Sequence, residues 1–402
     1  MEELKQKKFH LGRVFDISMG HFLHDVYSSF LTPLLPLFKE KFALSYFLVT
    51  SLSLYGRLPS LFNPFIGLLA DKITIRYFVI LMPAVTAISM SLLGLAQNYW
   101  QLSILLFIMG WSAAFFHVPA PVLIRRVAGS RSGLGMSFYM VGGELARTIG
   151  PLFITSAVAW WGLEGSWRVM PVGILASIIL FFRLRNLKKV DYKPKPKSGG
   201  AWSEFGKNKK LFIALTAYTF SRGMVRGVFV TLITTYVVVH GGDIWEGTYA
   251  LMIIQFAGAV GTMISGGFSD RFGRRTSLLF IASISPILLL LFNYTDGYMN
   301  MLILALIGLF IFGSNPILLA LVQDIKTDRP SFNNGIFMAI SFAFGGGATL
   351  LVGNLADITT LDMVYQLSPI FALIAIPFTL MMPKRVKEED KEEEKEEGEG
   401  GG

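Results

Sequence analysis

Long apolar segments recur along the chain from Val14 to Met382, and short polar stretches separate them. Each segment holds about twenty residues, the length that a helix needs to cross a hydrocarbon core of roughly 30 Å. Lipid offers the backbone no partners, so segments of this length must pair their own amides as helices, whereas barrel strands would show alternation. We predict about twelve membrane-spanning helices, over residues 14–38, 44–70, 77–96, 100–126, 133–158, 166–184, 211–239, 246–269, 276–293, 299–323, 333–356 and 364–382.

Composition excludes several other classes of protein. Hydrophobic residues make up 53% of the chain and charged residues 16%, values far from the soluble average that exclude a soluble two-domain protein. The chain has no cysteine, which excludes disulfides and thiolate chemistry. The first apolar run carries Asp16, His21, His24 and Asp25 and has no small-residue cleavage site, so we expect a retained helix rather than a signal peptide.

Lysine and arginine are concentrated in every second connecting segment. The positive-inside rule places these segments, and with them both termini, in the cytoplasm. The opposite loops hold almost no lysine or arginine and carry Trp160, Trp161 and Trp245 as interface anchors. The net charge of +9 follows from this distribution, so we expect a lipid bilayer as partner and no nucleic acid. The basic segments are residues 1–13, 71–76, 125–131, 183–210, 270–275, 324–329 and 383–395.

The longest connection, residues 183–210, contains a Lys-Pro repeat followed by a serine and two glycines, a composition that resists packing. We therefore predict an N-terminal six-helix bundle over residues 1–184, a cytoplasmic linker over 185–210 and a C-terminal six-helix bundle over 211–382. Residues 383–402 are rich in Glu and Lys and end in glycines, which predicts a disordered acidic tail.

Two features of the first half recur in the second. Gly67 and Asp71 near the end of the second span match Gly266 and Asp270 near the end of the eighth, at an offset of 199 residues. Small residues of the fifth span recur in the eleventh at an offset of 203 residues. Such a duplication predicts a substrate site between the halves, near the membrane midplane. The small residues, whose spacing allows close helix packing, are Gly142, Ala146, Gly150 and Pro151, then Gly345, Thr349 and Gly353.

Ionisable side chains at membrane depth cost roughly 2.5–3.5 kcal/mol each on insertion scales, so each one needs a reason. His21, His24 and Asp25 share one face of the first predicted helix. A histidine beside a carboxylate can change charge in the physiological pH range, so our first hypothesis is a proton-coupling group of these three residues, to which we add Glu144. The alternatives are structural pairing with neighbouring helices and a divalent-metal site that includes His117.

Four arginines lie at similar depth, against two clear acids, Asp25 and Glu144. Arg222 and Arg226 stand one turn apart in the seventh span, so they repel each other and need an anion: Asp25, Glu144 or the transported solute. Pairing of Glu144 with Arg147, three residues away, is a structural alternative. Arginine forks bind phosphonate, phosphate ester and carboxylate oxygens with two hydrogen bonds, so we hypothesise an anionic solute. The predicted substrate-binding residues are Arg57, His117, Arg147, Arg222, Arg226 and Asn315.

The second Gly-x-x-x-Asp copy continues with Arg271, Gly273, Arg274 and Arg275, and at this loop the chain resembles the major facilitator superfamily. The resemblance implies an all-α membrane fold of two pseudo-symmetric six-helix bundles. It also implies a cytoplasmic gate in which the carboxylate caps a neighbouring helix and basic residues bridge helix pairs. The residues that the resemblance places in this gate are Asp71, Arg76, Arg125, Asp270, Arg271, Arg274 and Arg275.

A narrower resemblance, over nearly the whole chain, is to the fosmidomycin-resistance branch of drug efflux proteins. It rests on residues 20–25, on Phe116 with His117, and on Arg125 with the Arg131-x-Gly133 pair. The small-residue ladder that ends in Gly150-Pro151 is similar to a motif associated with antiporters, with Ala146 in place of a glycine. This second resemblance implies export.

Together these patterns predict a multi-pass transporter of the cell (cytoplasmic) membrane that works by alternating access and exports a small anionic or drug-like solute in exchange for protons. We expect a monomer with the proton gradient as energy source, no cofactor and no resident metal. We do not expect an enzyme, because hydrolase and phosphate-loop motifs are absent from the sequence. The alternatives are an uptake symporter or uniporter of an anionic metabolite, a divalent-metal transporter, and a non-transport membrane protein.

Overall fold

The computed structural model describes residues 9–63, 66, 76–129, 132–186, 208–325 and 330–383, and these ranges are almost wholly helical, with no strand among them. The first half contains α2 (Leu11–Ser28), α3 (Leu31–Lys41), α4 (Tyr46–Tyr55), α6 (Arg76–Ser91), α7 (Tyr99–His117), α8 (Ala120–Ala128), α9 (Ser132–Gly165) and α10 (Met170–Leu184). The second half contains α12 (Lys209–Arg226), α13 (Ile233–Val239), α14 (Ile244–Phe272), α15 (Arg274–Phe292), α16 (Gly297–Gln323), α17 (Pro330–Ile358), α18 (Leu361–Leu373) and α19 (Ala375–Leu380). Short turns are η1 (Leu58–Phe62), η2 (Leu92–Leu95), η4 (Ser166–Val169) and η5 (Gly227–Thr231).

Each of the twelve predicted spans overlaps at least one of these helices. Within the described ranges, eight segments are long and apolar enough to cross a membrane, and a ninth is added if α12 to α13, bent by 48°, counts as one. One of the eight, Phe138–Leu184, covers two predicted spans. The predicted linker and tail, apart from residues 185, 186, 208–210 and 383, lie outside the described residues.

Several predicted spans are interrupted by breaks in the helix. The first span breaks between α2 and α3, just before Pro33, and the fourth breaks between α7 and α8 at Pro119. Proline lacks the amide proton and its ring clashes with an earlier carbonyl, which accounts for both breaks. Within the loop predicted at 159–165, α9 is kinked at Gly162, where φ is 73° and ψ is 168°, so the backbone leaves helical geometry there before a last short turn to Gly165.

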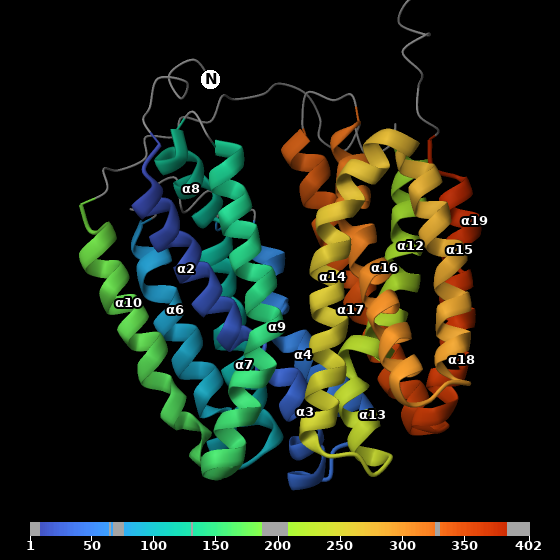
Figure 1. Cartoon of the computed structure of the whole chain (residues 1–402), viewed down its shortest axis with the longest axis horizontal. Coiled ribbons are helices and arrows are strands. Elements are labelled where there is room, and N and C mark those ends of the chain that lie inside the picture. Colours follow the sequence, from blue (N-terminus) through green and yellow to red (C-terminus); the bar gives the residue numbers. More distant parts are fainter. Residues whose placement is uncertain are drawn as a thin grey trace, which may run out of the picture.

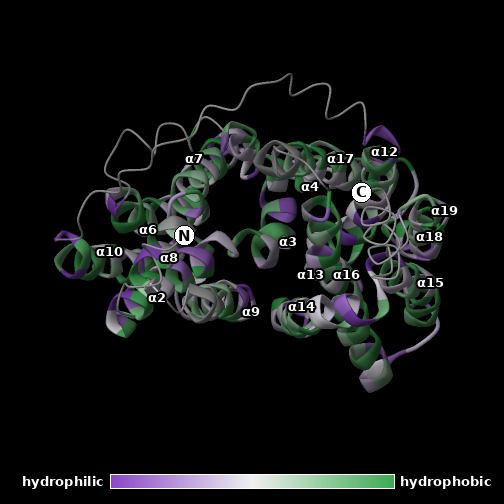
Figure 2. Cartoon of the chain, turned by 90° about the horizontal axis from the view of Figure 1, so that it is seen from above, coloured by the Kyte–Doolittle hydropathy of each residue, from purple (hydrophilic) through white to green (hydrophobic). Residues whose placement is uncertain are grey.

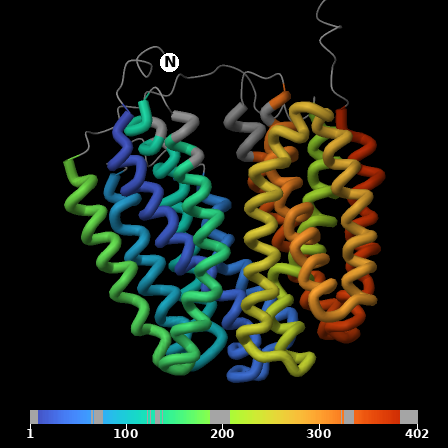
Figure 3. Tube along the Cα trace, in the orientation of Figure 1, coloured from blue at the N-terminus to red at the C-terminus, as the bar shows by residue number. Residues whose placement is uncertain are grey.

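The helices form two groups that stand side by side (Figure 1). We call the end at which α2 begins and α10 ends the upper end, as in Figure 1, and the other the lower end. The tube in Figure 3 shows the first half, coloured from blue to green, beside the second half, coloured from light green to red. From above, α3 and α4 reach towards α13 and α17 of the other group (Figure 2).

In each half a buried tyrosine joins the first span to the last. The Tyr27 hydroxyl donates to the Val169 carbonyl at 2.5 Å, which joins the first span of the first half to its last. In the second half the Tyr365 hydroxyl donates to the Val228 carbonyl at 2.9 Å, again between first and last spans. Both tyrosines are fully buried among apolar side chains, so each hydrogen bond satisfies a polar group that water cannot reach.

Helix α9 packs closely on α2 through its small residues. A Cβ on Gly142 would come within 2.8 Å of the Ser18 carbonyl oxygen, and one on Gly150 within 2.5 Å of the Val26 carbonyl oxygen. Ala146 between them is fully buried. The small-residue ladder therefore lets two backbones approach where larger side chains would hold them apart.

The halves are joined near the lower end. The carboxylate of Asp357, at the end of α17, accepts hydrogen bonds from the amides of Tyr46 at 2.6 Å and Phe47 at 2.8 Å, the first residues of α4. A carboxylate at a helix N-terminus is favoured by the free amides and the helix dipole. On the other side, the hydroxyls of Thr155 on α9 and Thr248 on α14 lie 2.8 Å apart. These contacts hold the lower end together.

We expect Gly150→Ala to lower the stability of the protein, since the new methyl meets the α2 backbone and the Ser29 side chain. Overpacking of this kind costs about 1–3 kcal/mol. Gly347→Ala is the matched control, because Gly347 lies within α17 and a Cβ there would meet nothing within 4 Å. Thermal unfolding in detergent measures both variants. Equal melting temperatures for the two would contradict the packing assignment.

We expect Asp357→Asn to open the lower end, because an amide replaces a charged acceptor that holds two amides. Solvent screens this exposed carboxylate, so the effect is about 1 kcal/mol, or about a fivefold shift in the ratio of closed to open molecules. The chain has no native cysteine, so spin labels can be attached to single cysteines introduced in place of Trp160 and Tyr298. The distance between the two labels reports the distance between the halves. Asp362→Asn is the control, since Asp362 pairs with His240 inside the second half. An unchanged distance distribution in Asp357→Asn would contradict the account.

Candidate functional site

A buried carboxylate lies at the centre of the first half. Asp25 on α2 is 3% exposed. Its Oδ1 lies 2.9 Å from His24 Nδ1 and 3.2 Å from His117 Nε2, and its Oδ2 lies 3.3 Å from His21 Nε2 and 3.7 Å from an Arg147 nitrogen. The structure therefore brings together three of the four predicted proton-coupling residues, with His117 of α7 and Arg147 of α9.

Aromatic packing fixes the orientation of the histidine rings. The His21 ring stacks on the Tyr139 ring with centroids 3.8 Å apart, and the His24 ring stacks on Phe116 at 4.7 Å. His21 Nδ1 also lies 2.7 Å from the Tyr139 backbone carbonyl. Held in this way, the rings keep their nitrogens on the carboxylate of Asp25.

Arg147 connects Asp25 to the fourth predicted proton-coupling residue, Glu144. One guanidinium nitrogen lies 2.9 Å from the Glu144 carboxylate, one turn earlier on α9. The Arg147 and His117 side chains are each 39% exposed, whereas that of Asp25 is 4% exposed. Arg147 and His117 therefore form the solvent-facing edge of the Asp25 cluster.

Three further arginines have no acid in ion-pair contact within the described residues: Arg57, Arg222 and Arg226. Arg222 donates to the Asn315 side-chain oxygen at 2.6 Å, and Arg226 lies over the Phe312 ring at 5.0 Å. The positive charges of Arg57, Arg222 and Arg147 lie close enough to Arg226 to repel its charge. Arginines of the first and second halves are therefore neighbours. Asp25, one of the acids that we had considered as their partner, contacts Arg147 instead.

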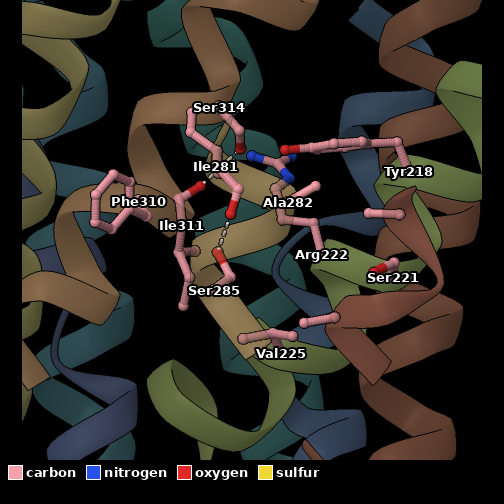
Figure 4. Close-up of a pocket in the computed structure, with 12 residues that line it drawn as sticks. Tyr218, Ser221, Arg222, Val225, Ile281, Ala282, Ser285, Phe310, Ile311 and Ser314 are labelled. Carbon is pink, nitrogen blue, oxygen red and sulfur yellow. Dashed lines mark hydrogen bonds between the residues drawn. The ribbon is translucent and has the colours of Figure 1, made fainter. Parts of the chain in front are cut away.

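Arg222 also lines a pocket inside the second half. The pocket lies among α12, α15, α16 and the α18–α19 junction and is narrow, with about 30 Å³ of space for water-sized molecules. Tyr218, Arg222 and Ser314 point towards one another at one end, while Val225, Ile281 and Phe310 line other parts (Figure 4). In the described structure Arg222 Nε is buried there without a hydrogen-bond partner. The pocket therefore has a polar end, at Arg222, and an otherwise mainly apolar lining.

Only part of the predicted gate can be located. Asp71 and the Arg125 side chain lie outside the described residues, while Arg76 lies against Tyr77. In the second copy, Arg274 pairs with Asp270 at 2.5 Å and with Asp324 at the end of α16 at 3.2 Å. Arg275 donates to the Met382 carbonyl at 3.4 Å, and Arg271 lies over Phe272. These contacts tie α14, α15, α16 and α19 at the upper end.

The remaining predicted packing residues belong to α17, apart from Pro151, which lies inside α9. A Cβ on Gly353 would come within 2.7 Å of the Tyr46 carbonyl oxygen, so this glycine lets α17 pack on α4. Gly345 lies against Gly223 of α12. A Cβ on Gly223 would come within 2.7 Å of the Gly345 carbonyl oxygen. Both glycines therefore lie where α17 meets another helix.

His21, Asp25 and His117 each offer one ligand atom, and these atoms lie within 4.8 Å of one another. We do not assign a metal site to them. The Arg147 guanidinium already supplies a positive charge beside the carboxylate, and a divalent cation next to it would be repelled. The surroundings favour a proton over a metal ion.

Two functional contacts were missed by sequence reasoning. Tyr139 supplies a carbonyl and a ring to His21, yet a tyrosine in an apolar helix carries no distinguishing signal. Asp357 joins the halves, and its position four residues after Gly353 on α17 was a signal that we could have used.

Comparison with known proteins identifies relatives over most of the chain. A family model described as Major Facilitator Superfamily matches residues 17–350. The chain is 24% identical to the fosmidomycin resistance protein of Escherichia coli strain K12 over 375 residues, which cover 91% of each protein. It is 25% identical to the multidrug resistance protein MdtG of Proteus mirabilis over 291 residues, 69% of this chain and 72% of the relative.

Solved structures share the fold at low sequence identity. A bacterial homologue of the human lysosomal transporter Spinster, in an inward-facing unoccupied conformation, aligns with a TM-score of 0.75 at 16% identity over 92% of this chain and 96% of that one. The nucleoside transporter NupG aligns with a TM-score of 0.75 at 14% identity over 92% of this chain and all of that one. These likenesses support two bundles of six spans.

We expect a double-mutant cycle of Glu144→Gln and Arg147→Gln to show coupling of about 1 kcal/mol in unfolding free energy, because the two side chains are in direct contact at membrane depth. The same cycle on Asp16 and Arg183, paired at 3.0 Å with the arginine 57% exposed, should show no measurable coupling. Denaturant or thermal unfolding in detergent provides the values. Additive effects at Glu144 and Arg147 would show that the two side chains do not interact.

Proposed function

The chain belongs to the Major Facilitator Superfamily, and from that premise we propose that this membrane transporter exports a small anionic, drug-like solute in exchange for protons. The observation that supports the proposal most strongly is the group of cations at the centre of the protein. Arg57, Arg222 and Arg226 lie close enough for their positive charges to repel one another. In the described part of the chain, no acid forms an ion pair with any of the three. An anionic solute would supply the missing charge.

The position of the arginines suits alternating access. Arg57 follows α4 in the first half, whereas Arg222 and Arg226 lie on α12 in the second. Repulsion between them opposes closure of the halves around an empty site, and an anion that bridges them removes that repulsion. The pocket beside Arg222 has a mainly apolar lining, which would contact the apolar part of a solute once the pocket widens.

The Asp25 cluster supports coupling to protons. A carboxylate that is almost fully buried, with three imidazoles and one guanidinium around it, can gain or lose a proton with little movement. The solvent-facing His117 and Arg147 provide a route for the proton and a link to the cationic region. We propose the proton gradient as the only energy source, with no cofactor, in a monomer in the cytoplasmic membrane with both termini in the cytoplasm.

One observation favours export over uptake: the relatives named above are resistance proteins. Uptake of an anionic metabolite would use the same residues and remains the second candidate, since the fucose–proton symporter FucP shares the fold with a TM-score of 0.62 at 16% identity. Transport measured in both orientations in vesicles separates the two.

We expect the double variant Arg222→Ala with Arg226→Ala to lose at least about tenfold in transport of the anion, because removing a buried charged partner costs about 2–5 kcal/mol. The assay follows fosmidomycin, inorganic phosphate and small carboxylates in proteoliposomes. The control is Arg183→Ala, which removes an arginine of α10 whose side chain is 57% exposed. Its rate of anion transport should stay within about twofold of that of the unsubstituted protein. Transport of the anion at the full rate by the double variant would overturn the anionic assignment.

A further inference from the structure

The three histidines around Asp25 differ in what their second nitrogen faces. All three present one nitrogen to the carboxylate, at 2.9 Å for His24, 3.2 Å for His117 and 3.3 Å for His21. A neutral imidazole has one donor nitrogen and one acceptor nitrogen, so the partner of the far nitrogen decides which tautomer the ring can hold. This difference distinguishes the three rings as proton carriers.

His24 has no place for a second proton. Its Nδ1 donates to Asp25 Oδ1, while its Nε2 is buried without any hydrogen-bond partner in the described structure. The ring is fully buried and stacks on Phe116. A proton on Nε2 would be an unsatisfied charged donor away from water, so this ring stays neutral.

His117 is satisfied as a neutral ring. Its Nε2 faces Asp25 Oδ1, and its Nδ1 lies 3.4 Å from the Tyr139 hydroxyl, which can donate to it. Both nitrogens therefore have suitable partners with a single proton on the ring. His117 has no geometric need for a second proton.

His21 faces an acceptor on each side. Its Nδ1 lies 2.7 Å from the Tyr139 backbone carbonyl, which can only accept, so Nδ1 carries a hydrogen. Its Nε2 lies 3.3 Å from Asp25 Oδ2. If the ring carried only the Nδ1 proton and the carboxylate carried none, His21 Nε2 and Asp25 Oδ2 would both be acceptors. The two atoms would then face each other without a hydrogen in a buried site. A second proton must lie between them.

We infer that the transferable proton is held between His21 Nε2 and Asp25 Oδ2, and that the Tyr139 carbonyl selects His21 rather than His24 or His117 to hold it. The inference rests on the proposed proton-coupled function and deepens it. When the proton leaves, Asp25 Oδ2 needs a new donor, and the Arg147 guanidinium at 3.7 Å is the cation within reach. Proton loss would thus draw Arg147 towards Asp25.

Helix α9 positions the pair from one side. Tyr139 provides the carbonyl, and one turn later a Cβ on Gly143 would lie 2.5 Å from His21 Cε1 and 3.3 Å from Asp25 Oδ2. Gly143 is a positioning residue, because any side chain there would push on the shared proton. The ionisable groups that contact His21 or Asp25 in the described residues are His24 on α2, His117 on α7, and Tyr139 and Arg147 on α9.

The test uses two matched substitutions, His21→Asn and His24→Asn. An asparagine amide can replace a histidine Nδ1–H, so it keeps the bond to Tyr139 in one variant and the bond to Asp25 in the other. Only His21→Asn removes the nitrogen that holds the second proton. Fosmidomycin counterflow, which needs no net proton movement, and fosmidomycin-driven proton movement are measured in the same proteoliposomes.

We expect proton movement to fall at least tenfold relative to counterflow in His21→Asn, and this ratio to change by less than about threefold in His24→Asn. Undiminished proton movement in His21→Asn, or a selective loss in His24→Asn, overturns the inference. If His21→Asn also loses counterflow, His21→Gln decides, since its amide is a permanent donor to Asp25. Fosmidomycin binding to His21→Gln should lose its pH dependence, and an unchanged pH profile overturns the inference. An unsubstituted protein that moves fosmidomycin without protons contradicts the proposed coupling instead.

Discussion

A carboxylate buried at membrane depth must be paired, and the arrangement of the first half follows from the pairing of Asp25. Left alone there, its charge would be costly, so α7 and α9 approach α2 closely enough to supply imidazoles and a guanidinium. Close approach needs small residues, and α9 provides them at Gly142, Gly143 and Gly150. The small residues of α9 are therefore needed for Arg147 to reach the buried carboxylate of Asp25.

The two halves share a fold but divide the charges between them. The acids at membrane depth, Asp25 and Glu144, lie in the first half, where Arg147 partners both. In the second half, Arg222 and Arg226 have no acid in contact within the described residues. A duplicated framework with unequal charges can place a proton site on one side of the central region and an anion site on the other. Arg147, within electrostatic range of Arg226, connects the two.

The sequence was enough to predict much of the fold, because each span has a strong apolar signal and proline marks the breaks. The turn between the fifth and sixth spans was predictable as well, and there α9 leaves helical geometry at Gly162, directly after Trp160 and Trp161. At the site, the spacing of His21, His24 and Asp25 predicted one cluster. The Tyr139 carbonyl could not be predicted, because every residue has one and only the packing of α9 on α2 brings this one to His21.

The most direct test of the account is to reconstitute the protein into liposomes that contain a pH-sensitive dye and to add an anion such as fosmidomycin. The account predicts anion-dependent proton movement that is lost in the Asp25→Asn protein while the protein still folds. Anion flux without any proton movement in the unsubstituted protein would contradict it, and would identify a uniporter whose buried carboxylate serves only to hold α2, α7 and α9 together.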